Sequence, residues 1–162
     1  MGATVLGETI QAVYDETTHR IVGRLTKDVD LFGGIKEVCK KFNVQAAQFQ
    51  CMGSLAYATY CQPEQTSDGE LRYSPKIKTA TPVELLSGTG FVGLDVEGEL
   101  DIHFHGLFVD CHQTISGGHF LEGENPVAIT IEFILFPLPD VQLQRGNDAI
   151  WNLPIFQFTQ KG

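Results

Sequence analysis

Apolar and polar residues alternate along most of this chain, and a period of two is typical of β-strands that bury one face. Residues 9–14 and 19–25 are the first such segments, and the polar run from Asp15 to Thr18 between them predicts a β-hairpin. The same pattern predicts further strands at residues 45–51, 55–61, 76–80, 83–86, 90–94, 99–109 and 127–136. The chain is therefore expected to be rich in β-structure.

One helix is predicted between the second and third strands. Its apolar positions follow the spacing i, i+4, i+7, i+8 and i+11 of a single buried stripe, at Leu31, Ile35, Val38, Cys39 and Phe42. Asp30 is expected to cap its first turn, and Asn43 to adopt the left-handed conformation after its last turn. Gly33 and Gly34 weaken the first turn by about 1 kcal/mol each relative to alanine.

Three other segments complete the outline. Gly53 interrupts a strand and predicts a bulge or a close approach of backbone. Residues 63–69 are rich in Gln, Thr, Ser, Asp and Gly and predict a loop. This loop is the segment most expected to be mobile. Residues 150–158 are apolar, so we expect them to pack on the body or on a neighbouring subunit. One helix among many strands, without βα alternation, indicates an α+β fold with a mainly antiparallel sheet.

Length and composition narrow the class of protein. The 162 residues suit one domain, residues 1–162, and the 43% of hydrophobic residues include no run near the roughly 18 needed to span a membrane. Nothing near Met1 has the pattern of a secretion signal, so a cytoplasmic location is expected. The four cysteines lack C-x-x-C spacing, which excludes a zinc ribbon and favours reduced thiols.

The net charge of −9 opposes nucleic-acid binding, which usually needs a basic surface. The closest basic group, Lys36, Lys40 and Lys41, fits the solvated face of the predicted helix. Any contact with DNA must therefore be argued from something other than composition.

The most unusual stretch is "HFHGLFVDCHQTISGGHF", residues 103–120. In a strand, His103 and His105 point to the same face, about 6.5 to 7 Å apart along the chain. If "DCHQTIS" is a hairpin loop centred on His112, His105 lies opposite His119, and all three imidazoles share one face. A register slip of one residue would separate them. Gly117-Gly118 fits a bulge or kink with positive φ just before His119.

Three neutral imidazoles with an open position suit zinc, and also nickel or iron(II). Asp101 on the same face, or Glu132 on the strand "VAITIEFILF", is a candidate fourth ligand or a partner that orients a ligand. The alternative is that the H-x-H step is only a polar strand face, and spacing alone does not decide between them. His19 and His112 lie in turn-like polar settings and are expected at the surface.

The order of motifs resembles the plant and prokaryote conserved domain, the PPC family, over about residues 20–137. The elements that carry the resemblance are Arg24-Leu25, Asp30-Leu31, Gly53-Ser54, Glu84-Leu85-Leu86-Ser87, the pair His103 and His105, and Gly117-Gly118-His119. The combination of H-x-H with G-G-H is the specific part.

The resemblance implies a compact α+β domain that forms a homotrimer and, in some prokaryotic members, binds a metal through these histidines. Plant members add an AT-hook that enters the minor groove, and single-domain relatives carry a DNA-binding label. This chain has no AT-hook and no basic tail, and its "TPVELL" and "LTKDVDL" depart from the family pattern. These departures weaken the DNA-binding expectation, whereas the metal histidines His103, His105 and His119 are all present.

Three functions remain open. The first is a homotrimeric metal-binding PPC protein of regulatory or DNA-binding role, with zinc as the expected metal. The second is a small metalloenzyme that activates water, with Asp101, Glu84 or Glu132 as general base. The third is a cupin-like barrel suggested by "GELDIHFHGLFVD", but four residues separate Gly98 from His103 and no Glu follows at the required spacing. A pocket with an open coordination position would favour the enzyme.

Overall fold

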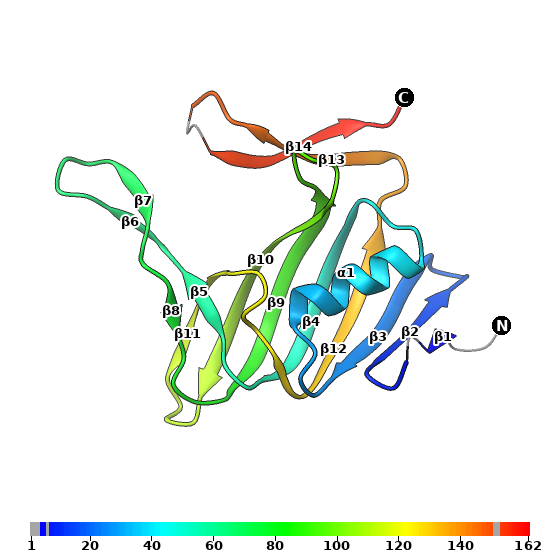
Figure 1. Cartoon of the computed structure of the whole chain (residues 1–162), viewed down its shortest axis with the longest axis horizontal. Helices are drawn as coiled ribbons and strands as arrows, with labels where there is room; N and C mark the ends of the chain where they lie inside the picture. The colour runs from blue at the N-terminus through cyan, green and yellow to red at the C-terminus, as the bar shows by residue number, and fades with distance from the viewer. Residues whose placement is uncertain (1–3, 6, 151–152) are drawn as a thin grey trace.

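The chain folds around one large sheet. The computed structural model describes residues 4–5, 7–150 and 153–162. In chain order its elements are β1 Thr4–Val5, β2 Ile10–Asp15, β3 Arg20–Thr26, α1 Leu31–Lys41, β4 Ala47–Leu55, β5 Thr59–Cys61, β6 Pro63–Gln65, β7 Leu71–Tyr73, β8 Ile77–Lys78, β9 Val83–Leu94, β10 Leu100–Asp110, β11 Ile115–Phe120, β12 Val127–Pro137, β13 Val141–Asn147 and β14 Pro154–Gln160. The main path runs β1-β2-β3-β12-β4-β9-β10-β11-β5-β8, and its pairs are antiparallel (Figure 1). The α+β prediction is confirmed.

Helix α1 begins and ends close to the predicted residues. Asp30 is the N-cap, and its Oδ2 accepts a hydrogen bond of 3.0 Å from the Gly33 backbone N–H. Oδ1 of the same carboxylate accepts a second one, of 2.9 Å, from the Asn125 backbone N–H. Asn43 has φ 54, the left-handed conformation expected just past the helix. The cap therefore also fixes the helix to the segment that leads into β12.

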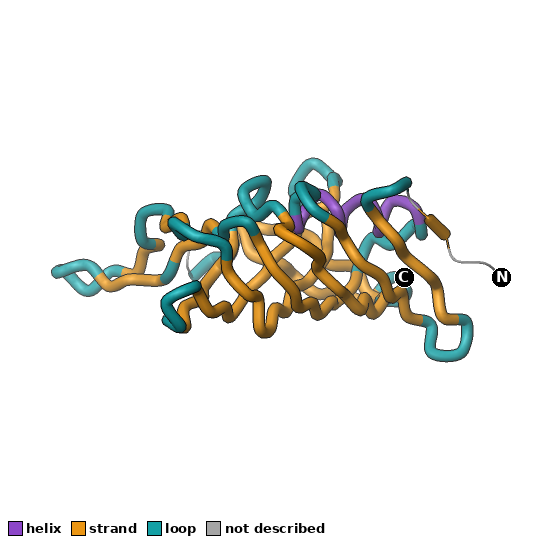
Figure 2. Tube along the Cα trace, turned by 90° about the horizontal axis from the view of Figure 1, so that it is seen from below, coloured by secondary structure: helices purple, strands orange, loops and turns teal. Residues whose placement is uncertain are grey.

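The core lies between α1 and one face of the sheet, which Figure 2 shows edge-on with the helix along one side. The buried stripe of α1 packs on side chains from the central strands. Phe104 of β10 lies under Phe32 with ring centroids 5.9 Å apart, and it stacks on Phe49 of β4 at 5.5 Å. Because strand side chains alternate, burial of Phe104 directs the residues beside it to the opposite face.

Two predicted strands, residues 83–86 and 90–94, are one continuous strand, β9. Its glycines do not mark a turn. A Cβ at Gly88 would lie 2.1 Å from Cζ of Phe104, and one at Gly90 would lie 2.5 Å from Cε1 of Phe49. The glycines make room for the core aromatic rings. Gly53, at φ +139, matches the predicted close approach, because a Cβ there would lie 2.1 Å from the Thr130 carbonyl oxygen.

Two hairpins lie beyond the main path of the sheet: β13–β14 at the top of Figure 1, and β6–β7, a separate two-stranded sheet, at its upper left. Strands β6 and β7 pair, so residues 63–65 of the segment expected as a loop form the first strand of a hairpin, whereas residues 66–69 lie in its turn. Its polar sequence suits strands exposed on both faces. Strands β13 and β14 pair with each other, and β13 joins β9 through the parallel pair Gln144 and Leu94.

The apolar tail packs on the body in part, as expected. Phe156 of β14 is 9% exposed and clusters with Ala46 and Leu143. Residues 151–152 of that tail lie outside the described residues. No helix in the described residues is long and apolar enough to cross a membrane.

Candidate metal centre

Three histidines gather on the sheet face that points away from α1. His103 and His105 lie on β10, and His119 lies on β11. His105 pairs directly with His119 across these antiparallel strands, as the hairpin centred on His112 predicts. Paired residues of neighbouring strands share a face, and residues two apart in one strand do as well, so the register brings all three rings together.

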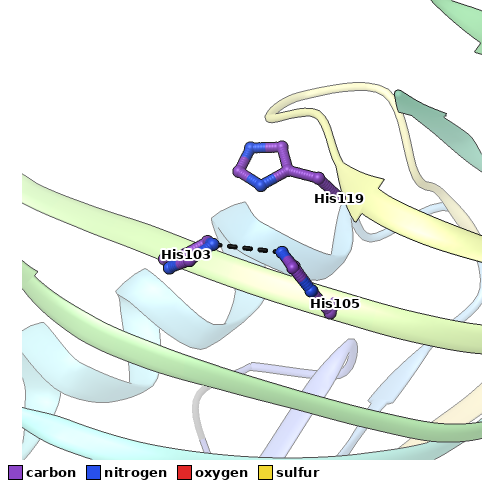
Figure 3. A group of neighbouring side chains, drawn as sticks. All are labelled: His103, His105 and His119. Carbon is purple, nitrogen blue, oxygen red and sulfur yellow. Dashed lines mark hydrogen bonds between the residues drawn. The ribbon is translucent and has the colours of Figure 1, made fainter. Parts of the chain in front are cut away.

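The three rings are close enough to share one ligand. One nitrogen from each histidine lies within 4.8 Å of those of the other two. Nε2 of His103 and Nε2 of His105 are 3.1 Å apart, and the three ring centroids are separated by 4.9 to 5.4 Å. Figure 3 shows His103 and His105 facing each other, with His119 above the gap between them.

Gly117 and Gly118 allow β11 to lie tightly between its neighbours. A Cβ at Gly117 would lie 2.2 Å from the Gly106 carbonyl oxygen of β10, and one at Gly118 would lie 2.6 Å from the Cys61 carbonyl oxygen of β5. Neither glycine has a positive φ, so the expected left-handed kink was wrong. The G-G-H motif is needed here for space: strands on both sides approach closely and hold His119 in register.

Burial favours the uncharged form of two of the rings. Burial is the largest cause that lowers the pKa of His119, to about 4, and the neighbouring His103 and His105 lower it further. Burial likewise lowers the pKa of His103, followed by the effect of His105. Neutral imidazoles offer the lone pairs that a metal ion requires.

One nitrogen of this cluster makes no hydrogen bond to any of the described residues. Nδ1 of His119 is buried there and has no hydrogen-bond partner. A buried polar atom without a partner costs about 1–3 kcal/mol unless something satisfies it. A cation between the rings would satisfy it. The donor set and the spacing therefore fit a divalent transition metal.

Asp101 lies beside the cluster but is already bound. Its Oδ2 accepts a hydrogen bond of 2.6 Å from Nε of Arg145 on β13. Arg145 also donates from Nη1 to the Pro154 carbonyl oxygen at 3.0 Å, and its Cζ lies 4.3 Å from the centroid of the Phe156 ring. Asp101 is therefore placed to hold Arg145 next to the histidines.

The two glutamates proposed from the sequence lie on strands farther away. Glu132 is exposed on β12, which is three strand positions from β10, or roughly 14 Å. Glu84 is exposed on β9 and pairs with Val109, four residues and about 13 Å along β10 from His105. Neither joins the three-histidine group among the described residues.

The remaining histidines are at the surface, as predicted. His19 is exposed in the turn after β2, where its Nδ1 lies 2.9 Å from the Tyr14 hydroxyl. His112 is exposed in the turn between β10 and β11.

Sequence reasoning missed Arg145 and Tyr73. Tyr73 of β7 lies against His119 with ring centroids 5.3 Å apart. Both come from hairpins whose position over the sheet depends on distant pairing. The alternation in "VQLQRGN" could have revealed β13 as a strand, but no local signal places Arg145 beside Asp101.

Comparison with known proteins finds one family. The model of the Plants and Prokaryotes Conserved (PCC) domain, the family called PPC above, matches residues 13–139. A search of curated proteins finds no match.

Several solved structures share the fold. A plant- and prokaryote-conserved (PPC) protein from Pyrococcus horikoshii aligns with a TM-score of 0.72 and 20% identity, over 98% of this chain and 100% of its own. A metal-containing protein from Archaeoglobus fulgidus aligns with a TM-score of 0.72 and 21% identity, over 93% and 99%. A "putative DNA-binding protein" from Ralstonia eutropha aligns with a TM-score of 0.70 and 19% identity, over 90% and 94%. At these identities the likeness is one of fold.

Proposed function

Since the chain belongs to the Plants and Prokaryotes Conserved domain family, we propose that it is a single-domain, homotrimeric metal-binding protein with a regulatory or interaction role. His103, His105 and His119 would hold one divalent transition metal, with zinc as the best fit. The four cysteines are free, which agrees with a reducing compartment and supports a cytoplasmic location.

The convergence of three histidine nitrogens is the observation that carries this proposal. A tetrahedral zinc with Zn–N bonds of 2.0–2.1 Å places its nitrogens about 3.4 Å apart. His103 and His105 already have nitrogens 3.1 Å apart, and the full set lies within 4.8 Å. Small side-chain rotations are enough to complete the site. The metal-containing relative from Archaeoglobus fulgidus supports the same reading.

Metal content tests the proposal. The chain, purified without chelator or affinity tag, should contain about one transition metal ion per chain by elemental analysis. His105→Ala should lose most of it, because two imidazoles and water bind zinc far more weakly than three imidazoles. His112→Ala, which removes an exposed histidine from the same hairpin, should keep it. Metal content that is absent, or equal in His105→Ala, contradicts the proposal.

The trimer is supported by the exposed sheet face. Opposite α1 this face carries large apolar side chains that solvent reaches, among them Val22, Met52, Leu86 and Leu107 at 40 to 58% exposure. Several large exposed apolar side chains on one face are typical of interaction sites. Light scattering coupled to gel filtration should give three times the chain mass of 17.9 kDa. Met52→Glu should reduce that mass, whereas Val96→Glu, on a loop, should leave it unchanged.

A role without DNA contact fits the charge better than a DNA-binding one. The "putative DNA-binding protein" label of the relative from Ralstonia eutropha is the argument in favour of DNA. Against it, each chain has a net charge of −9, so a trimer would carry −27 and repel phosphates. We therefore propose protein or small-molecule partners for the regulatory role.

A small metalloenzyme is the second candidate, favoured by a cavity of about 510 Å³ that His103 and His119 line. A zinc ion there would make bound water more acidic. Asp101 lines the same cavity, but its Oδ2 already accepts a hydrogen bond from Arg145. Hydrolysis of p-nitrophenyl acetate by the zinc-loaded chain, lost in His105→Ala and kept in His112→Ala, would favour the enzyme. No activity above free zinc would exclude this esterase chemistry.

A further inference from the structure

The cavity beside the histidines is assembled from three separate parts of the fold. The sheet contributes His103 and Asp101 from β10 and His119 from β11, and the two hairpins contribute Tyr73 and Arg145. The remaining lining residues are Asp95, Val96, Leu153, Pro154 and Ile155. Its volume of about 510 Å³ falls within the usual 300–1,000 Å³ of small-molecule sites.

One wall of the cavity presents a fixed cation. The side chain of Arg145 is 17% exposed, and it is held by Asp101, by the Pro154 carbonyl oxygen and by the Phe156 ring. A guanidinium has five N–H donors, and these two hydrogen bonds use two of them. The contacts thus orient Arg145 and leave donors for an oxyanion, for which the planar guanidinium is well shaped.

The rim of the cavity is apolar and open to solvent. Val96, Leu153 and Ile155 are 69, 46 and 39% exposed, although they line a concave surface. Tyr73, a residue that is 48% exposed, adds an aromatic ring that lies against His119. Apolar side chains that remain exposed around a pocket are placed to cover the apolar part of a ligand.

The charged groups around the cavity decide whether it favours an anion or a cation. Asp95 and Asp101 supply two negative charges, but Asp101 is paired with Arg145. Asp95 accepts hydrogen bonds from the backbone N–H groups of Glu97 and Glu99, which tie its carboxylate into a turn. With a divalent ion on the histidines these groups have one net positive charge, and without it one net negative charge. An anion is therefore favoured only when the metal is bound.

We propose that this cavity binds a small organic monocarboxylate with a short apolar or aromatic body. The carboxylate is held between Arg145 and the metal ion, and the body packs against Tyr73, Leu153 and Ile155. The proposal rests on the metal centre proposed above. It assigns the two hairpins a role in selecting the ligand.

Benzoate is a suitable probe, measured by calorimetry on zinc-loaded protein whose metal content is known. We expect benzoate to bind, and neutral benzamide to bind at least tenfold more weakly, because it lacks the negative charge. Metal-free protein should bind benzoate at least tenfold more weakly than zinc-loaded protein. In cobalt-loaded protein, benzoate should shift the visible absorption spectrum, which reports directly on the ion.

Substitutions distinguish the effect of the Arg145 guanidinium on benzoate affinity from the effect of the cavity's net charge. Asp101→Asn combined with Arg145→Gln removes one charge of each sign, so a tenfold loss of benzoate affinity in the double variant is due to the lost guanidinium. Ile155→Ser at the apolar rim should weaken benzoate at least fivefold and leave acetate unchanged. Arg24→Gln, on the distant strand β3, is the control and should bind benzoate as the wild type does.

The outcomes distinguish this proposal from the one on which it rests. A chain that takes up no metal overturns both. A zinc-loaded chain that does not bind benzoate overturns only the ligand proposal. A zinc-loaded chain that binds benzamide as tightly as benzoate does the same. Equal benzoate affinity in the wild type and in the Asp101→Asn, Arg145→Gln double variant also overturns it, provided that circular dichroism and metal content show the variant folded and loaded.

Discussion

His105 of β10 lies directly across from His119 of β11, fourteen positions later in the chain. This pairing closes the triangle with His103, because a strand shifted by one residue would turn His119 to the side of α1. The proposed metal centre therefore depends on the register of one hairpin. Any change that alters this register should remove metal binding, even if every histidine is kept.

Zinc should stabilise the wild-type chain and not His119→Ala. A ligand that binds only the folded state adds about 2.7 kcal/mol when its free concentration is 100 times Kd. For a chain of this length that raises Tm by about 5 to 10 °C. Differential scanning fluorimetry with and without zinc measures the shift. His112→Ala should show the wild-type shift, and a full shift in His119→Ala would contradict the assignment.

Two adjacent glycines of α1 should respond in opposite directions to alanine. A Cβ at Gly33 would lie 3.6 Å from the nearest neighbouring atom, an ordinary contact, so Gly33→Ala should stabilise the fold by about 0.5–1 kcal/mol through helix propensity. A Cβ at Gly34 would lie 2.7 Å from both Leu25 methyl groups, so Gly34→Ala should destabilise it by about 1–3 kcal/mol. Urea unfolding measures both, and each variant is the other's control.

Asp30→Ala should cost about 2–3 kcal/mol of unfolding free energy. It removes the cap on Gly33 and leaves the Asn125 backbone N–H without its carboxylate partner. Asp30→Ser keeps a capping oxygen but does not reach Asn125, so its loss should be intermediate. Stability of Asp30→Ser equal to that of the wild type in urea would show that the link to Asn125 contributes nothing.

Alkaline pH should weaken the fold through its buried thiols. Burial raises the pKa of Cys39 and of Cys51 from 9.0 to about 12. The unfolded thiols ionise first, so the stability present below pH 9 is lost as pH rises from about 9 to about 12. The urea midpoint should therefore fall over this range. It should fall less in Cys51→Ala, and as much as in the wild type in Cys111→Ser, whose thiol is exposed.

The chain should not bind random duplex DNA at physiological salt. Its net charge of −9 provides no basic surface to displace counterions from phosphates. Fluorescence anisotropy with a labelled duplex should show no change at 150 mM salt. A tight complex that weakens steeply with added salt would contradict this prediction.

The sequence predicts local structure well wherever a short-range pattern decides it. The stripe through Leu31 and Ile35 places the helix, and the symmetry of "HGLFVDCHQTISGGH" about His112 places His105 opposite His119. Both depend on periods of a few residues. Burial on one face of β10 then makes the alternation between Phe104 and the histidines unambiguous.

The structural features that could not be predicted from the sequence depend on contacts between distant segments. The "SGTG" stretch reads as a break, but it continues β9 because Gly88 accommodates a ring from β10. Arg145 reaches Asp101 only because β13 lies beside the end of β9, a contact between residues fifty positions apart. The polar residues of β6 and β7 form a hairpin although their composition is that of a loop. None of these follows from a local period.

The position of β12 has a consequence for how the protein is made. Strands β3 and β4 are close in sequence but do not pair, because β12, residues 127–137, lies between them. During synthesis on the ribosome, the edges of β3 and β4 that pair with β12 stay unpaired until β12 has been made. The intervening seventy or so residues take about 4–15 s at 5–20 residues per second. Unpaired strand edges are templates for association with other chains. A nascent chain that stalls before Val127 thus leaves both edges open to other chains and is a form that a chaperone would need to protect.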